Sequence, residues 1–420
     1  MPGIFHSRGR KTPFLIIFAV LGLVLTALLV LQIPAVKDRL NWRLERAQAY
    51  LGGVVHPIKA MPTAQAVSGN NEQAATPSIT PLPPTPTPTA KISPTPLPSP
   101  TALPASVKLE PPPYEYQDQN NCGPATMSMY LNYYGWNGDQ YTISDVIKPI
   151  PQDRNVNVDE LLYFTRNYAG WLSSEFRVGG STTLLRQLLA AGMPVVIEEG
   201  FYLAESYWPN DDRWAGHYLL ITGYDDAAQT FVTQDSFLGE NRVVAYKDLD
   251  RSWQTFNRVY FLVFSGDQED QVRSILGSDW DEKANRQHAL DTARAETKND
   301  PGNPYAWFNL GSNLVYFSGY SEAAAAYDTA RQIGLPQRML RYQFGPFFAY
   351  FNLNRNEDLL SLSEYALTIT KNSEEALLWH GWALYRDGKK AEALQEFDKA
   401  LQAHPNYTDA QYAITFVNEN

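Results

Sequence analysis

Cysteine is almost absent from this chain of 420 residues, which has one, Cys122. A single cysteine excludes an intramolecular disulfide and any metal site built from several thiolates. Charge is also sparse, since 19% of the residues are charged and the net charge is −11. The sequence has no long basic run, so we do not expect a nucleic acid as partner. The length predicts two or three domains.

The N-terminal part has the composition of a membrane anchor. Residues 14–33 form a nearly unbroken apolar run, and a helix of that length would cross about 30 Å of hydrocarbon. We therefore expect a short tail over 1–13 and a single transmembrane helix over 14–35, with the bulk of the chain outside the cytoplasm. A cleavable signal peptide is the alternative, but the following "QIPAVKDRL" offers no small-x-small cleavage site.

Residues 36–113 are expected to connect this anchor to the first folded domain. A short amphipathic helix at the membrane surface is expected over 40–53. Between residues 77 and 113 the chain carries 14 of its 29 prolines. Such a tract favours extended polyproline II, and 37 residues at about 3.1 Å each reach on the order of 100 Å. The simplest interpretation of the tract is an unstructured linker.

Residues 114–266 are expected to form a compact α+β domain in which Cys122 precedes or begins a helix. In "GPATMSMYLNYYG", Pro124 suits a first helical turn and Gly135 a helix end. The exposed N–H groups of a helix N-terminus favour a thiolate over a thiol. Gly123 leaves room for a substrate backbone beside the sulfur. A buried, unreactive cysteine is the alternative.

A thiolate nucleophile needs a base, and residues 114–266 contain one histidine, His217. "GHYLLITGYDD" predicts a strand followed by a hairpin turn, and "TFVTQDSFLG" predicts a second strand that contains Asp235. If the two strands pair antiparallel, the Asp235 carboxylate can orient the His217 imidazole. A structural histidine is the alternative interpretation.

Three segments, "QDQNNCGPATMSMYLNYYGW", "WAGHYLLITGYDD" and "TQDSFLG", together resemble the papain-like family that includes the bacteriocin-processing peptidases, which cut after double-glycine leaders. The stand-alone members, which lack a transporter, are the more similar ones. The resemblance covers 114–266 and implies a papain-like α+β fold. It further implies Cys122 as nucleophile, His217 as general base and then acid, and Asp235 as the orienting residue.

The same resemblance implies a glutamine that donates to the oxyanion, usually six positions before the cysteine. Tyr116 occupies that position here, whereas Gln117 and Gln119 stand nearby. We choose Gln117 as the oxyanion residue.

The remaining site predictions concern the substrate groove. The candidates for groove residues are Gly123, Trp208, Trp214 and Gly216, although the two tryptophans would equally serve to pin their loop. Glu198 and Glu199 are expected to lie one at the rim of the core and one in solvent. With one histidine in the domain, we expect neither a metal site nor a cofactor.

Residues 267–420 are expected to form an all-α solenoid, because the sequence repeats. Two units lie 70 residues apart, or two periods of 35, and they match at the pairs Gly311/Gly381, Tyr327/Phe397 and Ala330/Ala400. The pattern resembles tetratricopeptide repeats. A degenerate middle unit contributes Gly345 and Ala366, a partial unit precedes over 288–303, and "TDAQYAITFVNEN" closes the array.

These features together predict a membrane-anchored, extracytoplasmic thiol peptidase that cleaves peptide bonds by Cys-His-Asp acyl transfer. The repeats would recruit a peptide or protein substrate or partner, or serve as a scaffold packed against the peptidase. Two alternatives stay open. One is a non-catalytic peptide-binding module on the same fold, and the other is a thiol acyltransferase or amidase.

Overall fold

The structure is a computed structural model of the 420-residue chain and describes residues 17–18, 21–22, 25–26, 34–64, 103–150 and 153–420. The chain divides into two compact units. The first contains residues 1–59 and 203–213, and the second contains residues 60–202 and 214–420. We describe each unit by itself.

In the first unit, helix α2 (Pro34–Val55) confirms the helix predicted over 40–53 and is longer at both ends. The 203–213 loop contacts it. Arg46 forms an ion pair with Glu205 at 2.5 Å and lies over the Tyr207 ring at 5.5 Å. The predicted transmembrane span at 14–35 lies largely outside the described residues. In the part of the chain that the structure describes, no helix is long and apolar enough to cross a membrane.

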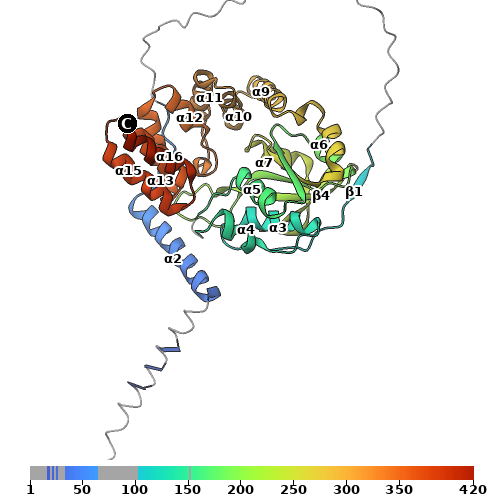
Figure 1. The fold of residues 1–420 in the computed structure, drawn as a ribbon, viewed down its shortest axis with the longest axis horizontal. Coiled ribbons are helices and arrows are strands. Elements are labelled where there is room, and N and C mark those ends of the chain that lie inside the picture. Colours follow the sequence, from blue (N-terminus) through green and yellow to red (C-terminus); the bar gives the residue numbers. More distant parts are fainter. Residues whose placement is uncertain (1–16, 19–20, 23–24, 27–33, 65–102, 151–152) are drawn as a thin grey trace, which may run out of the picture. The chain divides into compact units, whose positions relative to one another are not determined.

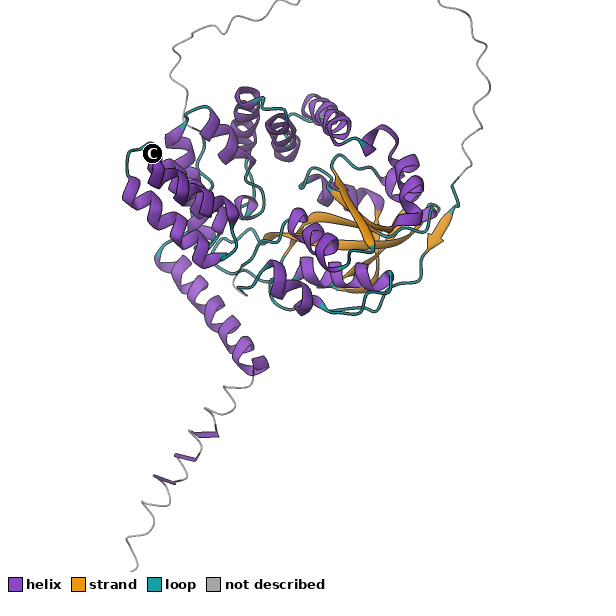
Figure 2. Ribbon diagram, viewed as in Figure 1, coloured by secondary structure: helices purple, strands orange, loops and turns teal. Residues whose placement is uncertain are grey.

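The second unit contains a seven-stranded sheet in which every pair of neighbouring strands is antiparallel (Figure 2). Along the main path the order is β2-β7-β3-β4-β5-β6, and β1 pairs with β4. The strands are β1 (Ser106–Lys108), β2 (Leu172–Arg177), β3 (Val195–Tyr202), β4 (Trp214–Asp225), β5 (Thr230–Asp235), β6 (Gly239–Ala245) and β7 (Tyr260–Ser265).

Helices cover both faces of this sheet. The helices around the sheet are α3 (Cys122–Tyr133), α4 (Gln140–Ile147), α5 (Val158–Tyr168), α6 (Thr182–Ala190), α7 (Tyr246–Gln254) and α8 (Glu269–Leu276). Side chains of α6, α7 and α8 form one core with Ile197, Leu219 and Leu262. Helix α3 packs on the opposite face, where the Tyr130 hydroxyl donates to the Pro194 carbonyl at 2.5 Å and its ring lies 6.2 Å from that of Phe261. Strand residues alternate between these faces, as a two-residue period requires.

The sheet begins earlier than the predicted domain start at residue 114. Strand β4 continues past the end of β3, which leaves its Gly223–Asp225 stretch without a partner on that side. Strand β1 pairs with that stretch, and the Tyr224 hydroxyl donates to the Pro104 carbonyl at 2.7 Å. The last residues of the predicted linker therefore belong to the folded domain, because they cover a strand edge that would otherwise be exposed.

Helix pairs follow in the C-terminal part, in yellow to red in Figure 1. They are α9 (Glu282–Asn299), α10 (Pro304–Tyr316), α11 (Tyr320–Ile333), α12 (Gly345–Asn352), α13 (Asn356–Ile369), α14 (Glu374–Arg386), α15 (Lys390–Ala403) and α16 (Thr408–Glu419). This region is tetratricopeptide-repeat-like, as predicted, and α16 is the expected closing helix.

The 70-residue correspondence between the first and last units has a common structural cause. A Cβ atom at Gly311 would lie 2.7 Å from the Tyr327 ring, and one at Gly381 would lie 2.4 Å from the Phe397 ring. In both pairs a small residue lets the aromatic ring of the second helix approach the backbone of the first. The middle unit departs from this rule. Gly345 begins α12 instead of lying within it, and a Cβ there would meet the Tyr327 hydroxyl of the previous unit.

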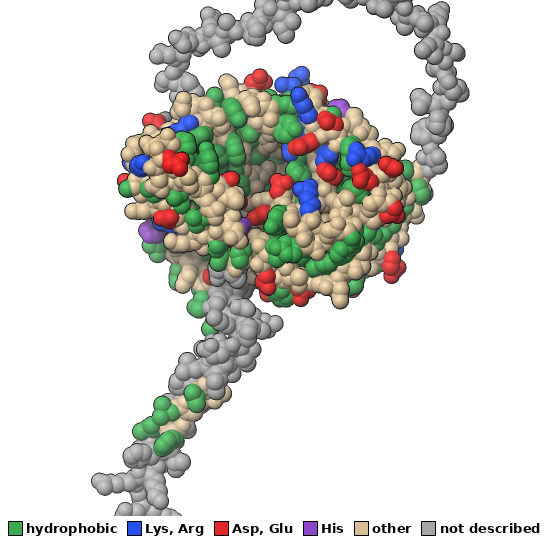
Figure 3. All heavy atoms as spheres, viewed as in Figure 1, with side chains coloured by type: hydrophobic (Ala, Val, Ile, Leu, Met, Phe, Trp, Pro, Cys, Tyr) green, Lys and Arg blue, Asp and Glu red, His purple; other side chains and the backbone are tan. Residues whose placement is uncertain are grey.

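The repeats and the region that contains the sheet are joined by hydrogen bonds within the second unit. Asn309 donates to the Gln254 carbonyl at 2.8 Å, and Asn155 donates to the Glu375 carboxylate at 2.7 Å. Acidic and basic side chains are interspersed over the face shown in Figure 3. That face therefore carries no basic patch of the kind that would bind a nucleic acid.

Candidate active site

Cys122 is the first residue of α3, as the sequence predicts. The residue is half-buried. Asn120 has a φ of +57°, a left-handed conformation that asparagine tolerates better than most residues and that turns the chain into the helix. A Cβ added at Gly123 would lie 3.4 Å from the Tyr218 ring and from Val156, which is ordinary van der Waals contact. The glycine beside the thiol therefore lies close to β4.

Two buried side chains that the sequence analysis did not identify hold the segment before Cys122. The Gln140 amide accepts from the Asp118 N–H at 2.7 Å and from Asn121 Nδ2 at 3.1 Å. The Lys148 ammonium donates to the carbonyls of Asn120 at 2.7 Å and Asp153 at 3.0 Å. Both residues lie on or just after α4, so a separate element fixes the approach to the thiol.

His217 and Asp235 come together as predicted, on the antiparallel strands β4 and β5. His217 Nε2 lies 2.9 Å from Asp235 Oδ1, and both side chains are buried. Asp235 also accepts from the N–H groups of Phe237 and Leu238 at 2.9 Å each and from Arg242 at 2.9 Å. Since Nε2 faces the carboxylate, Nδ1 is the ring nitrogen that remains for a proton exchange with Cys122.

The pKa shifts of these three residues describe an ion pair. Burial alone would raise the pKa of the Cys122 thiol, but its hydrogen bond to His217 and the charges of His217 and Lys148 lower that pKa below its ordinary value. Burial opposes the charged form of His217, but Asp235 and Cys122 outweigh this and raise the pKa of His217 to about 10. The pKa of Asp235 is lowered because hydrogen bonds from His217 and the backbone outweigh its burial.

Gln117 contacts Ser236, the residue after Asp235. The Gln117 N–H donates to the Ser236 carbonyl at 2.8 Å, and the Ser236 hydroxyl donates to Gln117 Oε1 at 3.0 Å. With Oε1 engaged, the side-chain NH₂ is the free end of the amide. Tyr116, which occupies the family's usual glutamine position, is 62% exposed.

Of the remaining groove candidates, the two tryptophans are buried. Trp214 is fully buried and stacks on Phe256 with 5.7 Å between ring centroids, so it packs the interior and does not border an open groove. Trp208 belongs to the first unit, where it is buried and its Cβ would lie 2.6 Å from a Cβ added at Gly53. Gly216 is half-buried against Phe256 and Tyr342.

The expectation that one of two glutamates on β3 faces solvent is wrong. Glu199 is opposite His217 in the sheet, is buried, and accepts from the Ser252 hydroxyl. Glu198 lies next to Tyr218 and close enough to feel the charge of Cys122, and burial raises its pKa well above the ordinary value. A protonated Glu198 adds no negative charge next to the thiolate.

This region has a papain-like α+β fold. It carries a cysteine at the start of a helix and a His–Asp pair on adjacent strands. Residues 108–261 match the model of the Peptidase_C39 like family, which confirms the predicted resemblance. No curated protein matches the chain.

Solved structures similar to parts of the chain fall into two groups. A C39-like peptidase from Bacillus anthracis is 16% identical, with a TM-score of 0.30, over 38% of this chain and 98% of its own. A double glycine motif protease from an AMS/PCAT transporter, in complex with the leader peptide, is 17% identical, with a TM-score of 0.28, over 38% of this chain and 94% of its own. A TPR protein with an unusual peptide-binding site, YrrB, is 20% identical, with a TM-score of 0.29, over 36% of this chain and 74% of its own.

Proposed function

We propose that the chain is a membrane-anchored, extracytoplasmic cysteine peptidase with Cys122 as nucleophile, His217 as base and acid, and Asp235 as the orienting residue. The observation that carries this proposal is the placement of His217, which interacts with the Cys122 thiol and with Asp235 Oδ1 at 2.9 Å. A buried imidazole held between a thiol and a carboxylate is suited to take a proton from the thiol and to return it to a leaving group.

In the first half of the reaction, the Cys122 thiolate attacks the carbonyl carbon of the peptide bond. The negative charge that develops on the carbonyl oxygen is stabilised by the Gln117 NH₂ group and by a backbone N–H at the start of α3. The His217 imidazolium then donates its proton to the leaving amine as the carbon–nitrogen bond breaks. The product is a thioester between Cys122 and the acyl half of the substrate.

In the second half, the neutral His217 imidazole removes a proton from water, which attacks the thioester carbonyl. The carbon–sulfur bond breaks, the acid product leaves, and the thiolate–imidazolium pair is restored. Asp235 stays ionised throughout, since its hydrogen bonds favour the carboxylate.

The test is cleavage of a defined peptide mixture by the full-length chain, with Cys122→Ala as control and half of the solvent water as H₂¹⁸O. New peptide termini that need Cys122 and carry ¹⁸O in the new carboxylate support hydrolysis. Products joined to an added amine would indicate an acyltransferase instead. Identical peptide patterns with the wild type and Cys122→Ala would contradict both activities and leave the non-catalytic binding module.

We further propose that the repeats recruit an extended peptide or protein segment. This is supported by a contact of the chain with itself. Arg331 of α11 donates from Nε and Nη2 to the Pro62 carbonyl at 2.9 and 2.6 Å, and residues 60–64 have no regular secondary structure. A buried arginine that binds a backbone carbonyl of a segment without regular secondary structure is suited to peptide recognition. Loss of peptide affinity in Arg331→Lys, measured with the Cys122→Ala chain, would test this role.

The anchor at 14–35 and the extracytoplasmic location rest on the apolar run of the sequence. We expect the full-length chain to stay with the membrane fraction at alkaline pH and to be digested by a protease added outside intact cells. Release at alkaline pH, or protection of the peptidase domain in intact cells, would contradict this part of the proposal.

A further inference from the structure

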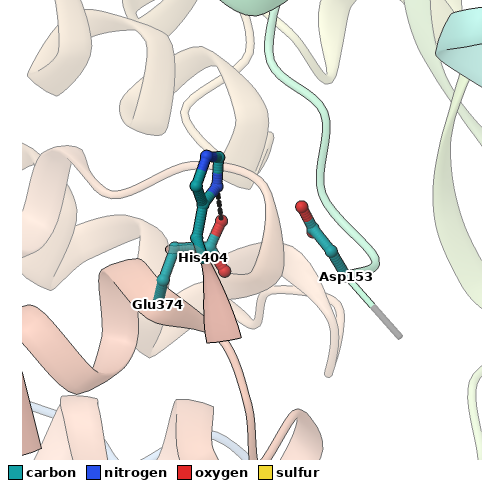
Figure 4. A group of neighbouring side chains, drawn as sticks. All are labelled: Asp153, Glu374 and His404. Carbon is teal, nitrogen blue, oxygen red and sulfur yellow. Dashed lines mark ion pairs between the residues drawn. The ribbon is translucent and has the colours of Figure 1, made fainter. Parts of the chain in front are cut away.

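Away from the candidate active site, three potential metal ligands converge from distant parts of the sequence. They are Asp153, in the loop before α5, Glu374, the first residue of α14, and His404, which directly follows α15. One ligand atom from each lies within 4.8 Å of the other two. Figure 4 shows the Asp153 carboxylate turned toward Glu374 and His404, whose Oε1 and Nδ1 atoms are 3.5 Å apart.

Asp153 lacks a partner for one of its two carboxylate oxygens. The residue is only 3% exposed. Its Oδ1 accepts from the Asn155 N–H at 2.9 Å, whereas Oδ2 is buried and has no hydrogen-bond partner among the described residues. A buried carboxylate oxygen without a partner is costly, and a cation is the group that would satisfy it.

Two further carboxyl groups lie around these three residues. A Glu160 carboxylate oxygen lies 4.0 Å from His404 Nδ1, and the Glu375 carboxylate accepts from Asn155 Nδ2 at 2.7 Å. Two cationic side chains, Lys148 and Arg341, also lie close to these carboxylates. The Lys148 ammonium donates to two backbone carbonyls, and Arg341 Nε donates to Thr370 at 2.8 Å.

We propose that Asp153, Glu374 and His404 bind a divalent transition-metal ion of the Zn²⁺ type. Two carboxylates balance the charge of one divalent cation, and the imidazole nitrogen favours Zn²⁺ or a similar ion over Ca²⁺ or Mg²⁺, which prefer oxygen ligands. Three atoms within 4.8 Å of one another have a central point no farther than about 2.8 Å from each. Bonds from Zn²⁺ to nitrogen and carboxylate oxygen are about 2.0 to 2.2 Å long. Each ligand atom would therefore have to move toward the central point by well under 1 Å.

The site would join the peptidase domain to the repeats. Asp153 belongs to the former, and Glu374 and His404 belong to the latter. The Asp153 carbonyl is bound by Lys148, which also binds the carbonyl of Asn120, two residues before the nucleophile. The metal would therefore fix the last repeat relative to the loop that supports the start of α3, and its role is structural.

The experiment measures Zn²⁺ binding to the full-length chain in a Cys122→Ser background, so that the thiol cannot take up the metal. The protein is stripped with a chelator, dialysed against buffered Zn²⁺, and its bound zinc is measured by mass spectrometry. We expect one equivalent per chain. We expect His404→Ala and Asp153→Asn to weaken the affinity by at least about tenfold. His288→Ala is the matched control, because His288 is an exposed histidine paired with Asp279 elsewhere, and it should bind zinc normally.

Asp153→Asn keeps the volume of the side chain, so it decides the question if His404→Ala fails to fold. As a second readout, Zn²⁺ should raise the unfolding temperature of the Cys122→Ser chain and leave that of the Asp153→Asn variant unchanged. The proposal would be overturned if the Cys122→Ser chain bound no zinc. It would also be overturned if that chain and its Asp153→Asn variant bound zinc equally well.

Discussion

The Tyr342 ring packs directly on Gly216, the residue before His217. A Cβ added at Gly216 would lie 3.2 Å from the Tyr342 ring and 2.8 Å from Phe256 Cζ. Tyr342 belongs to the stretch between α11 and α12, and its ring is 5.8 Å from that of Trp214. The repeat region thus contacts the strand that carries the candidate base.

The first prediction follows from this contact. Gly216→Ala should force β4 or the Phe256 ring to move and so displace His217. We expect kcat to fall by about tenfold to a hundredfold with a smaller change in KM, because small displacements of a catalytic group are costly. Gly266→Ala is the control, since a Cβ there meets nothing within 4 Å. Full activity in Gly216→Ala would show that the packing does not position His217.

The second prediction separates the two glutamines near Cys122. The Ser236 hydroxyl orients Gln117, whereas the Gln119 N–H donates to its neighbour Asp118. Gln117→Ala should lower kcat by about 10²- to 10³-fold, the usual cost of losing one oxyanion donor. Gln119→Ala should leave kcat within about threefold of the wild type. The reverse order of effects would assign the oxyanion role to Gln119.

The third prediction concerns the pH dependence of kcat/KM. The active ion pair forms as the pH rises through the lowered pKa of Cys122 and is lost as the pH rises through the pKa of His217, about 10. Asp235→Asn removes a charge that raises the pKa of His217, so the alkaline limb should move to lower pH. We also expect kcat to fall by at least about a hundredfold. An alkaline limb that stays in place would mean that it does not report His217.

The fourth prediction concerns the stability of the repeats. Gly381→Ala would place a Cβ 2.4 Å from the Phe397 ring, and we expect it to lower the free energy of unfolding by about 1–3 kcal/mol. Replacing the ring in the double variant Gly381→Ala/Phe397→Leu should cost less than the two single changes added together. Strict additivity in denaturant unfolding would show that the two residues do not interact.

The sequence predicted where Cys122, His217 and Asp235 lie in the fold, because each of them stands in a local pattern. Cys122 precedes a helical signature, and His217 and Asp235 lie on two strands joined by a short turn. Gln140 and Lys148 were missed because they come from a different element, and only the tertiary fold brings them to the segment before Cys122.

Burial was harder to foresee than secondary structure. Trp214 lies in a sequence that reads as a loop beside the site, yet Phe256 and Tyr342 enclose it. Gly345 matches the repeat spacing approximately, but α12 starts at this residue, whereas Gly311 and Gly381 lie within their helices. Both differences depend on neighbours that are remote in the sequence.

The most direct test of the account is the rate of Cys122 alkylation by iodoacetamide as a function of pH, in the full-length wild type and in His217→Ala. Cys122 is the only thiol, so the signal belongs to one residue. We predict an apparent pKa well below the ordinary thiol value of about 8.5, and a rise toward that value when His217 is removed. An ordinary pKa that is the same in both proteins would contradict an activated Cys122–His217 pair and with it the proposed peptidase.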